Sequence, residues 1–173
     1  EGPNIGLINS LSVYARPPRG VKYLDESASY DDRARERGEY TQSKLSAERA
    51  LLEHARAHPR LRIIVLRPGL LYGPGAPLPI GCLELPSSSR RRPLVAGSPK
   101  TPMPLAFVDN VIDAMLAVQT SDVPSGSGFN LVDDPECTQG WVADPIAEVT
   151  EGLLRPRFVP YPIVWSLLLG SMS

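Results

Sequence analysis

The chain has 173 residues, of which 42% are hydrophobic and 21% charged, and its formal net charge is -1. This composition is ordinary for a globular chain long enough to bury a core, and the near-zero charge argues against a surface that binds DNA or RNA by neutralising phosphates. Two cysteines, Cys82 and Cys137, are too few for a disulfide scaffold and lack metal-site spacing, which favours a reducing, cytoplasmic location.

The first part of the chain predicts a strand, a long loop, a helix and a second strand. Residues 5–10 (IGLINS) suit a buried strand of a parallel sheet, and residues 15–38, rich in Pro, Arg and Asp, are typical of a surface loop. Apolar residues recur at helical spacing from Glu39 to His58, and Pro59 ends this helix. The β-branched run 61–68 predicts a buried strand closed by Pro68 and Gly69.

The second part of the chain has a less regular pattern, but predicted strands still alternate with predicted helices. Short apolar pieces at 80–85 and 93–97 lie among prolines and glycines, and residues 104–119 predict a strand running into a helix with Asp109 as its N-cap. Residues 128–133 predict another strand, and 141–153 a helix broken near Pro145. The apolar run 163–170 is far shorter than the ~20 residues of a membrane span, so it predicts a core or partner-facing helix.

Strands that alternate with helices indicate an α/β fold with a parallel sheet, because parallel neighbours need crossover connections. Open sheets of this kind bind ligands at the carboxyl ends of their strands. The glycines of RPGLLYGPG (67–75) do not have the G-x-G-x-x-G spacing of a phosphate cradle, yet the segment follows a strand and its backbone from Gly69 to Leu71 could face a cofactor. A simple strand-terminating turn is the alternative.

Tyr40 and Lys44 form the motif with the clearest chemical meaning. Positions i and i+4 of a helix lie one above the other, with Cβ atoms about 6 Å apart, so both side chains can reach one point. A free tyrosine, with a pKa near 10, is a poor base at neutral pH, and a nearby ammonium stabilises its phenolate. The alternative is a solvated helix face. Ser10 and Ser12, where the first strand ends, could hold a substrate oxygen or satisfy backbone groups.

Two other patterns are weaker evidence for a binding site. His54 and His58 have the spacing of helical metal ligands but lack both the Glu of an H-E-x-x-H motif and a third ligand, so we expect no metal and a favourable interaction with the helix end instead. The arginines at 90–92 could bind a diphosphate, although a solvated loop is the more common role of such a run.

Taken in order, INSLSVYA, YTQSK, LRPGLLYGPG, PLAFVDNVIDAMLA and FNLVDD resemble the extended short-chain dehydrogenase/reductases, also called the NAD-dependent epimerase/dehydratase family, over residues 5–135. The resemblance implies the C-terminal half of a Rossmann-type dinucleotide-binding domain in residues 1–75. It implies a small substrate-binding α/β subdomain in 76–173, of which 104–133 return in part to the Rossmann sheet. NAD or NADP is the implied cofactor, a small molecule the implied substrate, and a homodimer the implied assembly of the full-length protein.

The resemblance also implies roles for single residues. Tyr40 would be the general acid/base, and Lys44 would bind the nicotinamide ribose hydroxyls and favour the phenolate. Ser10, by its position before the VY pair, would orient the substrate oxygen, with Ser12 as the alternative. The segment that would touch the nicotinamide, mainly through its backbone, consists of Pro68, Gly69, Leu70 and Leu71.

The chain departs from the family pattern at several points. Its 173 residues contain no glycine-rich phosphate loop, and Ala15 stands where the family has glycine after VY. We therefore expect a truncated, C-terminal portion of an NAD(P)-dependent oxidoreductase or epimerase that acts on a secondary alcohol or ketone, such as a steroid or a sugar nucleotide, and expect this portion to be inactive alone. The alternative is a non-catalytic relative that binds a dinucleotide or a partner and senses redox state.

Overall fold

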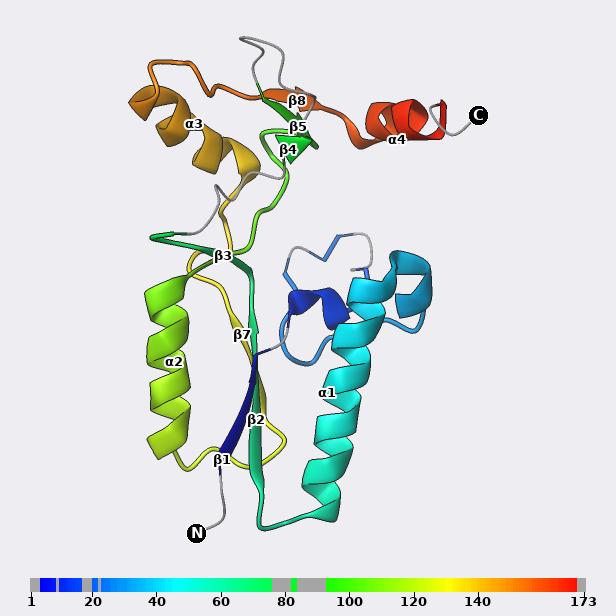
Figure 1. Cartoon of the computed structure of the whole chain (residues 1–173), viewed down its shortest axis with the longest axis vertical. Helices are drawn as coiled ribbons and strands as arrows, with labels where there is room; N and C mark the ends of the chain where they lie inside the picture. Colours follow the sequence, from blue (N-terminus) through cyan, green and yellow to red (C-terminus); the bar gives the residue numbers. More distant parts are fainter. Residues whose placement is uncertain are drawn as a thin grey trace. The chain divides into compact units, whose positions relative to one another are not determined.

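The computed structural model describes residues 4–8, 10–16, 20–21, 23–75, 82–83 and 93–170. They divide into two compact units, one of Glu1–Gly73 with Leu105–Asp133 and the other of Pro74–Pro104 with Asp134–Ser173 (Figure 1). Each unit has strands and helices of its own, and the α/β class with a Rossmann-type parallel sheet, predicted from the sequence, is confirmed.

The main sheet of the first unit has three parallel strands in the order β1 (Asn4–Ile8), β2 (Arg62–Pro68) and β7 (Gly128–Leu131). Helices α1 (Glu39–Ala57) and α2 (Val108–Thr120) lie on opposite faces of this sheet (Figure 1). Because both faces are covered, β2 is apolar on both, and Ile63 through Leu66 are buried without alternation.

Helix α1 follows the prediction from the sequence at both ends. It starts after Gly38, whose φ of 104° is in the left-handed region that glycine adopts without strain, and it ends one residue before His58. Glu39 in the first turn and His54 and Arg56 in the last match the helix dipole. Its buried face is formed by Thr41, Leu45, Glu48 and Ala55.

The predicted surface loop at 15–38 is partly folded onto α1. It contains a short 3-10 helix, η2 (Ala34–Arg37), and a two-residue bridge joins Tyr30 to Tyr14, just after the 3-10 turn η1 (Leu11–Val13). The Asp31 amide donates to Val13 O at 2.9 Å and the Ala15 amide to Ser29 O at 3.0 Å. Val13, Tyr14, Ala34 and Leu45 form a small buried core between these segments and α1.

A second, two-stranded parallel sheet pairs β3 (Leu70–Tyr72) with β6 (Leu105–Phe107), which leads directly into α2. The predicted N-cap, Asp109, is wrong: the N-cap position is Phe107, and Asp109 lies inside the first turn. The reason is a carboxylate from elsewhere in the chain. Asp133, which follows β7 in the sequence, accepts from the Phe107 backbone N–H at 2.7 Å and from Asn110 Nδ2 at 2.7 Å. Its carboxylate therefore caps the N-terminus of α2.

The second unit has a mixed sheet in which β5 (Leu94–Ala96) lies between β4 (Cys82–Leu83), antiparallel, and β8 (Arg157–Val159), parallel. Two helices, α3 (Gln139–Val149) and α4 (Tyr161–Gly170), complete it. The predicted break at Pro145 is wrong, since α3 runs through it. Pro145 and Trp141 are both exposed, so water can satisfy the Trp141 carbonyl that proline leaves without an N–H.

Across the residues that the structure describes, every helix is too short or too polar to cross a lipid bilayer. The apolar run predicted to form a core or partner-facing helix is part of α4, in which Val164 is buried while Tyr161 and Ile163 are half exposed. The three arginines at 90–92 lie outside the described residues.

The cap on α2 gives a stability prediction that separates the two aspartates. Asp133→Ala removes the carboxylate that binds the Phe107 amide, and we expect the free energy of unfolding to fall by about 1–2 kcal/mol. Asp109→Ala removes only a favourable charge near the helix N-terminus, worth about 0.3–1 kcal/mol. Urea denaturation of both variants measures the difference, and a larger loss for Asp109→Ala would contradict the assignment of the cap.

Candidate active site

Tyr40 and Lys44 lie side by side on the first turns of α1. The Lys44 Nζ is 5.6 Å from the centroid of the Tyr40 ring, a cation–π distance, and 60% of the Tyr40 side chain is exposed. The ammonium therefore sits next to an accessible phenol ring, and the two groups project from the same side of the helix. The structure brings these two predicted site residues together.

Ser10 lies where the chain leaves β1 and caps the 3-10 turn η1. Its Oγ accepts from the Ser12 amide at 3.2 Å, which still leaves the Ser10 hydroxyl proton to donate elsewhere. The Ser12 Oγ is buried and has no hydrogen-bond partner among the described residues. The structure thus gives the two serines different surroundings: one caps a turn, and the other carries an unsatisfied hydroxyl.

The segment Pro68–Leu71 crosses from β2 to β3 at the carboxyl end of the main sheet. The Gly69 amide donates to Leu131 O at 2.9 Å, so this donor is used within the protein. Leu70 and Leu71 are 48% and 43% exposed, which leaves two apolar side chains accessible beside the strand end.

Topology places these groups at one end of the sheet. Because β1 and β2 are parallel, α1 must start near the carboxyl end of β1 and run back to the start of β2. Ser10 after β1, Tyr40 and Lys44 at the head of α1, and Pro68 at the end of β2 all belong to that end. This is the position at which open α/β sheets bind ligands.

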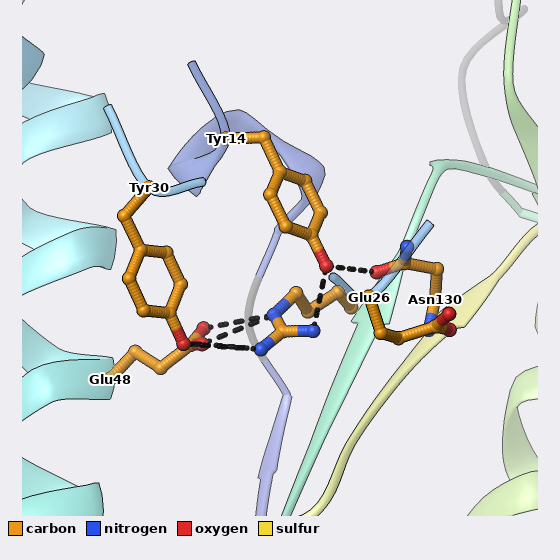
Figure 2. A network of polar contacts seen from close by, with 6 residues as sticks. Tyr14, Glu26, Tyr30, Glu48 and Asn130 are labelled. Carbon is orange, nitrogen blue, oxygen red and sulfur yellow. Dashed lines mark hydrogen bonds and ion pairs between the residues drawn. The ribbon is translucent and has the colours of Figure 1, made fainter. Parts of the chain in front are cut away.

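Sequence reasoning missed a buried polar network directly beneath this end, drawn in Figure 2. Arg67, 4% exposed, donates from Nη2 to Glu48 Oε1 at 2.6 Å, and its Nε lies 3.1 and 3.2 Å from the two Glu48 oxygens. Glu48 is fully buried. The Tyr30 hydroxyl donates to the same carboxylate at 2.6 Å, so the charge of Glu48 is matched by three donors from two segments.

Tyr14 extends the network to the neighbouring strand. Its hydroxyl accepts from Arg67 Nη1 at 2.8 Å and donates to Asn130 Oδ1 at 2.8 Å. Asn130 lies opposite Arg67 in the β2–β7 register, and its backbone N–H donates to Glu26 Oε1 at 2.7 Å. The Tyr14 and Tyr30 rings are nearly parallel, with centroids 6.5 Å apart (Figure 2).

The guanidinium also fills the space above Gly128 in β7. A Cβ built there would lie 2.7 Å from Arg67 Nη2 and 2.8 Å from Nη1, so any larger residue would displace the group that bridges α1 and η1. Gly128 is therefore required by close approach, not by its backbone conformation.

Two signals in the sequence could have identified this network. Glu48 follows Leu45 by three residues and precedes Ala55 by seven, which places a carboxylate on the buried face of α1. Arg67 is a charged residue near the end of a strand that is buried on both faces, directly after the apolar run Ile63–Leu66. Opposite charges at two buried positions indicate an ion pair, because an isolated buried charge is very costly.

The surroundings shift the ionisation of both tyrosines in the network. Burial raises the pKa of Tyr14, and the Arg67 cation offsets this only in part. Burial also raises the pKa of Tyr30, and its hydrogen bond to the Glu48 carboxylate acts in the same direction. For Arg67, burial opposes the charge, but the hydrogen bonds and charge of Glu48 prevail and raise its pKa. At neutral pH the network therefore holds the Arg67 cation and two neutral phenols.

The histidines of α1 form no evident metal site. The rings of His54 and His58 lie 4.2 Å apart between centroids, and within the described ranges no group of three or more His, Cys, Asp or Glu side chains could hold a metal ion.

The family model for the NAD dependent epimerase/dehydratase family matches residues 4–131. The chain belongs to this family. Its match spans β1, α1, β2 and β7, and thus every element that positions the candidate residues. Among curated proteins nothing matches significantly.

Solved structures share the fold at low identity. RMD from Pseudomonas aeruginosa, complexed with NADPH, has a TM-score of 0.69 and 18% identity over 92% of this chain and 55% of that one. A UDP-N-acetylglucosamine 4-epimerase from Methanobrevibacter ruminantium, in complex with UDP-N-acetylmuramic acid, has a TM-score of 0.69 and 17% identity over 91% of this chain and 50% of that one. A dTDP-glucose 4,6-dehydratase from Bacillus anthracis, in complex with NAD, has a TM-score of 0.64 and 17% identity over 90% of this chain and 49% of that one. The chain spans about half the length of these structural neighbours.

The raised pKa values of Tyr14 and Tyr30 predict how stability changes at high pH. Below the ordinary tyrosine pKa, about 10, folded and unfolded chains both keep these protons and the network contributes fully. As pH rises through that value the unfolded chain ionises first, so the free energy of unfolding falls.

We expect this loss to be shallower in Tyr14→Phe/Tyr30→Phe than in the parent chain, measured by urea denaturation at a series of pH values above 9. Tyr40→Phe, which removes an exposed hydroxyl from the same unit, is the matched control. An equally steep loss in the double variant and the parent would show that these two phenols do not titrate as their burial requires.

Proposed function

We propose that this chain is the C-terminal portion of an NAD(P)-dependent oxidoreductase or epimerase of the extended short-chain type. The observation that carries the proposal is the placement of an ammonium against an exposed phenol, Lys44 beside Tyr40, at the carboxyl end of a parallel sheet. Membership of the family supports it, since that family is defined as NAD-dependent epimerases and dehydratases. Two of the three structural neighbours described above are complexed with NAD or NADPH.

The side chains at this end fit the nicotinamide half of a dinucleotide. Lys44 supplies a cation that can donate to ribose hydroxyls, and the exposed Leu70 and Leu71, with Pro68 and Gly69, offer apolar surface and backbone to a flat ring. When bound, NAD or NADP would accept or supply the hydride. The 173 residues contain no G-x-G-x-x-G loop for the pyrophosphate, so the fit covers only part of the cofactor.

In the proposed mechanism each residue handles a proton or an oxygen. Tyr40 Oη gives a proton to the substrate oxygen or takes it away, and the Lys44 ammonium stabilises the phenolate that this creates. Ser10, whose Oγ proton remains available, donates to the same substrate oxygen and orients it; Ser12 is the alternative donor. A general acid/base at this position contributes about 10²–10⁴-fold to the rate.

As substrate we propose a secondary alcohol or ketone, of the steroid or sugar-nucleotide kind that the resemblance to the extended short-chain family implies. The first unit would form part of the dinucleotide-binding domain, and the second would form the substrate-binding subdomain. The epimerase from M. ruminantium binds UDP-N-acetylmuramic acid, which supports a sugar-nucleotide substrate. We further propose a cytoplasmic location and a homodimer of the full-length protein. The redox-sensing alternative is less favoured, because a sensor needs no accessible phenol beside an ammonium.

The proposed role of Tyr40 predicts a large loss of activity on removing one oxygen atom. In the complete protein that contains this chain, Tyr40→Phe should lower kcat by about 10²–10⁴-fold while leaving the fold intact, since Tyr40 is exposed. The assay follows NAD(P)H absorbance with a panel of secondary alcohols, ketones and nucleotide sugars. Tyr23→Phe, at another exposed tyrosine, is the control. Unaltered turnover in Tyr40→Phe would favour the redox sensor instead.

Because the 173 residues contain no G-x-G-x-x-G loop, we expect them to bind the cofactor weakly when tested alone. We expect calorimetry with NADH to give a dissociation constant well above the micromolar range, because the helix N-terminus that would bind the pyrophosphate is not part of this sequence. Circular dichroism of the same sample establishes that the chain is folded. Micromolar affinity of the folded chain would refute this prediction.

A further inference from the structure

The three segments that carry the proposed functional groups are joined through one buried guanidinium. Tyr14 lies four residues after Ser10, Glu48 lies four residues after Lys44, and Arg67 directly precedes Pro68. Arg67 hydrogen-bonds both Tyr14 and Glu48. Each functional segment therefore has a member of the network within four residues of its candidate residue. Figure 2 draws Tyr14 and Glu48 within this network.

The geometry of arginine suits this task. A guanidinium is planar and presents its donors in a fixed fork, so the positions of all its partners are set together. Nη1 donates to the Tyr14 hydroxyl, and Nε and Nη2 donate to the Glu48 carboxylate. The hydroxyl of Tyr30, in the loop, donates to the same carboxylate. A shift of α1 along or around its axis would break these bonds at a buried site.

We propose that Arg67 and Glu48 are positioning residues for the reaction described under the proposed function, on which this inference rests. They hold the Ser10 segment, the Tyr40/Lys44 helix and the Pro68–Leu71 segment in one arrangement. Neither side chain is exposed enough to touch a substrate: Glu48 is fully buried and Arg67 is 4% exposed. They act through the backbone of the elements that they join.

Stability alone gives little reason for such a pair. Replacing a buried ion pair by apolar residues of similar volume often leaves the stability of the fold unchanged or raises it. The ion pair instead fixes the relative positions of its elements, which apolar contacts do not specify. Tyr40 lies eight residues from Glu48, about 12 Å along the helix, so a small rotation at Glu48 moves the phenol relative to Ser10 and Pro68. A displacement of ~1 Å in a catalytic group can cost about 10²-fold in rate.

The test separates position from stability. In the complete protein, Glu48→Leu/Arg67→Met replaces the ion pair by apolar residues, and we expect parent-like resistance to urea, a kcat lowered about 10²-fold and a KM that changes little. Glu53→Leu/Arg60→Met makes the same chemical change at exposed positions and should retain parent kcat. Parent-like kcat in the folded Glu48/Arg67 double variant would overturn the proposal.

Two further measurements keep the outcome clear. Tyr14→Phe removes a single hydroxyl and keeps the ring, so if the double variant does not fold, parent-like kcat in Tyr14→Phe overturns the proposal in its place. Hydrogen exchange of the amides at 39–47 gives a readout that does not depend on activity, and we expect loss of protection in either variant; unchanged protection counts against the proposal. Full activity of Tyr40→Phe would instead show that the proposed function itself fails.

Discussion

The buried ion pair between Arg67 and Glu48 is the constraint that sets how the elements of the first unit are positioned. Two charges removed from water are costly unless every remaining donor and acceptor is satisfied. Here Tyr14 and Tyr30 complete the set, and Asn130 continues it to the adjacent strand (Figure 2). The partners come from the turn after β1, the loop, α1, β2 and β7, so the pair is satisfied only when all of these elements are in place.

This arrangement divides the unit into a rigid interior and an accessible end. Beneath the carboxyl end of the sheet the Glu48 and Arg67 side chains are buried and paired, while Tyr40, Leu70 and Leu71 above them remain exposed. The loop helps to fix the same end: Arg37 bonds both the Tyr14 carbonyl and Asp31, and holds the pKa of the Asp31 carboxyl below its ordinary value. A preorganised support beneath Tyr40 is what the proposed proton transfer requires.

How far the sequence predicted this depends on the range of the interactions. Helix α1 and strand β2 were predictable because periodicity, Pro59 and the Pro68–Gly69 pair are local signals. Asp109 looked like a cap because local sequence does not reveal that Asp133, 24 residues later, reaches the same helix end. The break at Pro145 failed because exposure of Trp141 allows the carbonyl to be hydrated.

The candidate site divides in the same way. The Tyr40–Lys44 spacing is a property of one helix, and the sequence alone predicted their adjacency, which is confirmed. Ser10 and Ser12 could not be separated, since the difference between them arises from the 3-10 turn that Ser10 caps. Glu48 and Arg67 were missed because their pairing joins positions 19 residues apart through tertiary packing.

The measurement that tests the central claim most directly is a crystal structure of the complete protein with NAD(P)H and a substrate analogue. We predict the Lys44 ammonium within hydrogen-bonding distance of the nicotinamide ribose and the Tyr40 Oη about 2.6–3.2 Å from the analogue's oxygen. A nicotinamide ring bound away from Pro68–Leu71, with the Tyr40 phenol directed into solvent, would contradict the account.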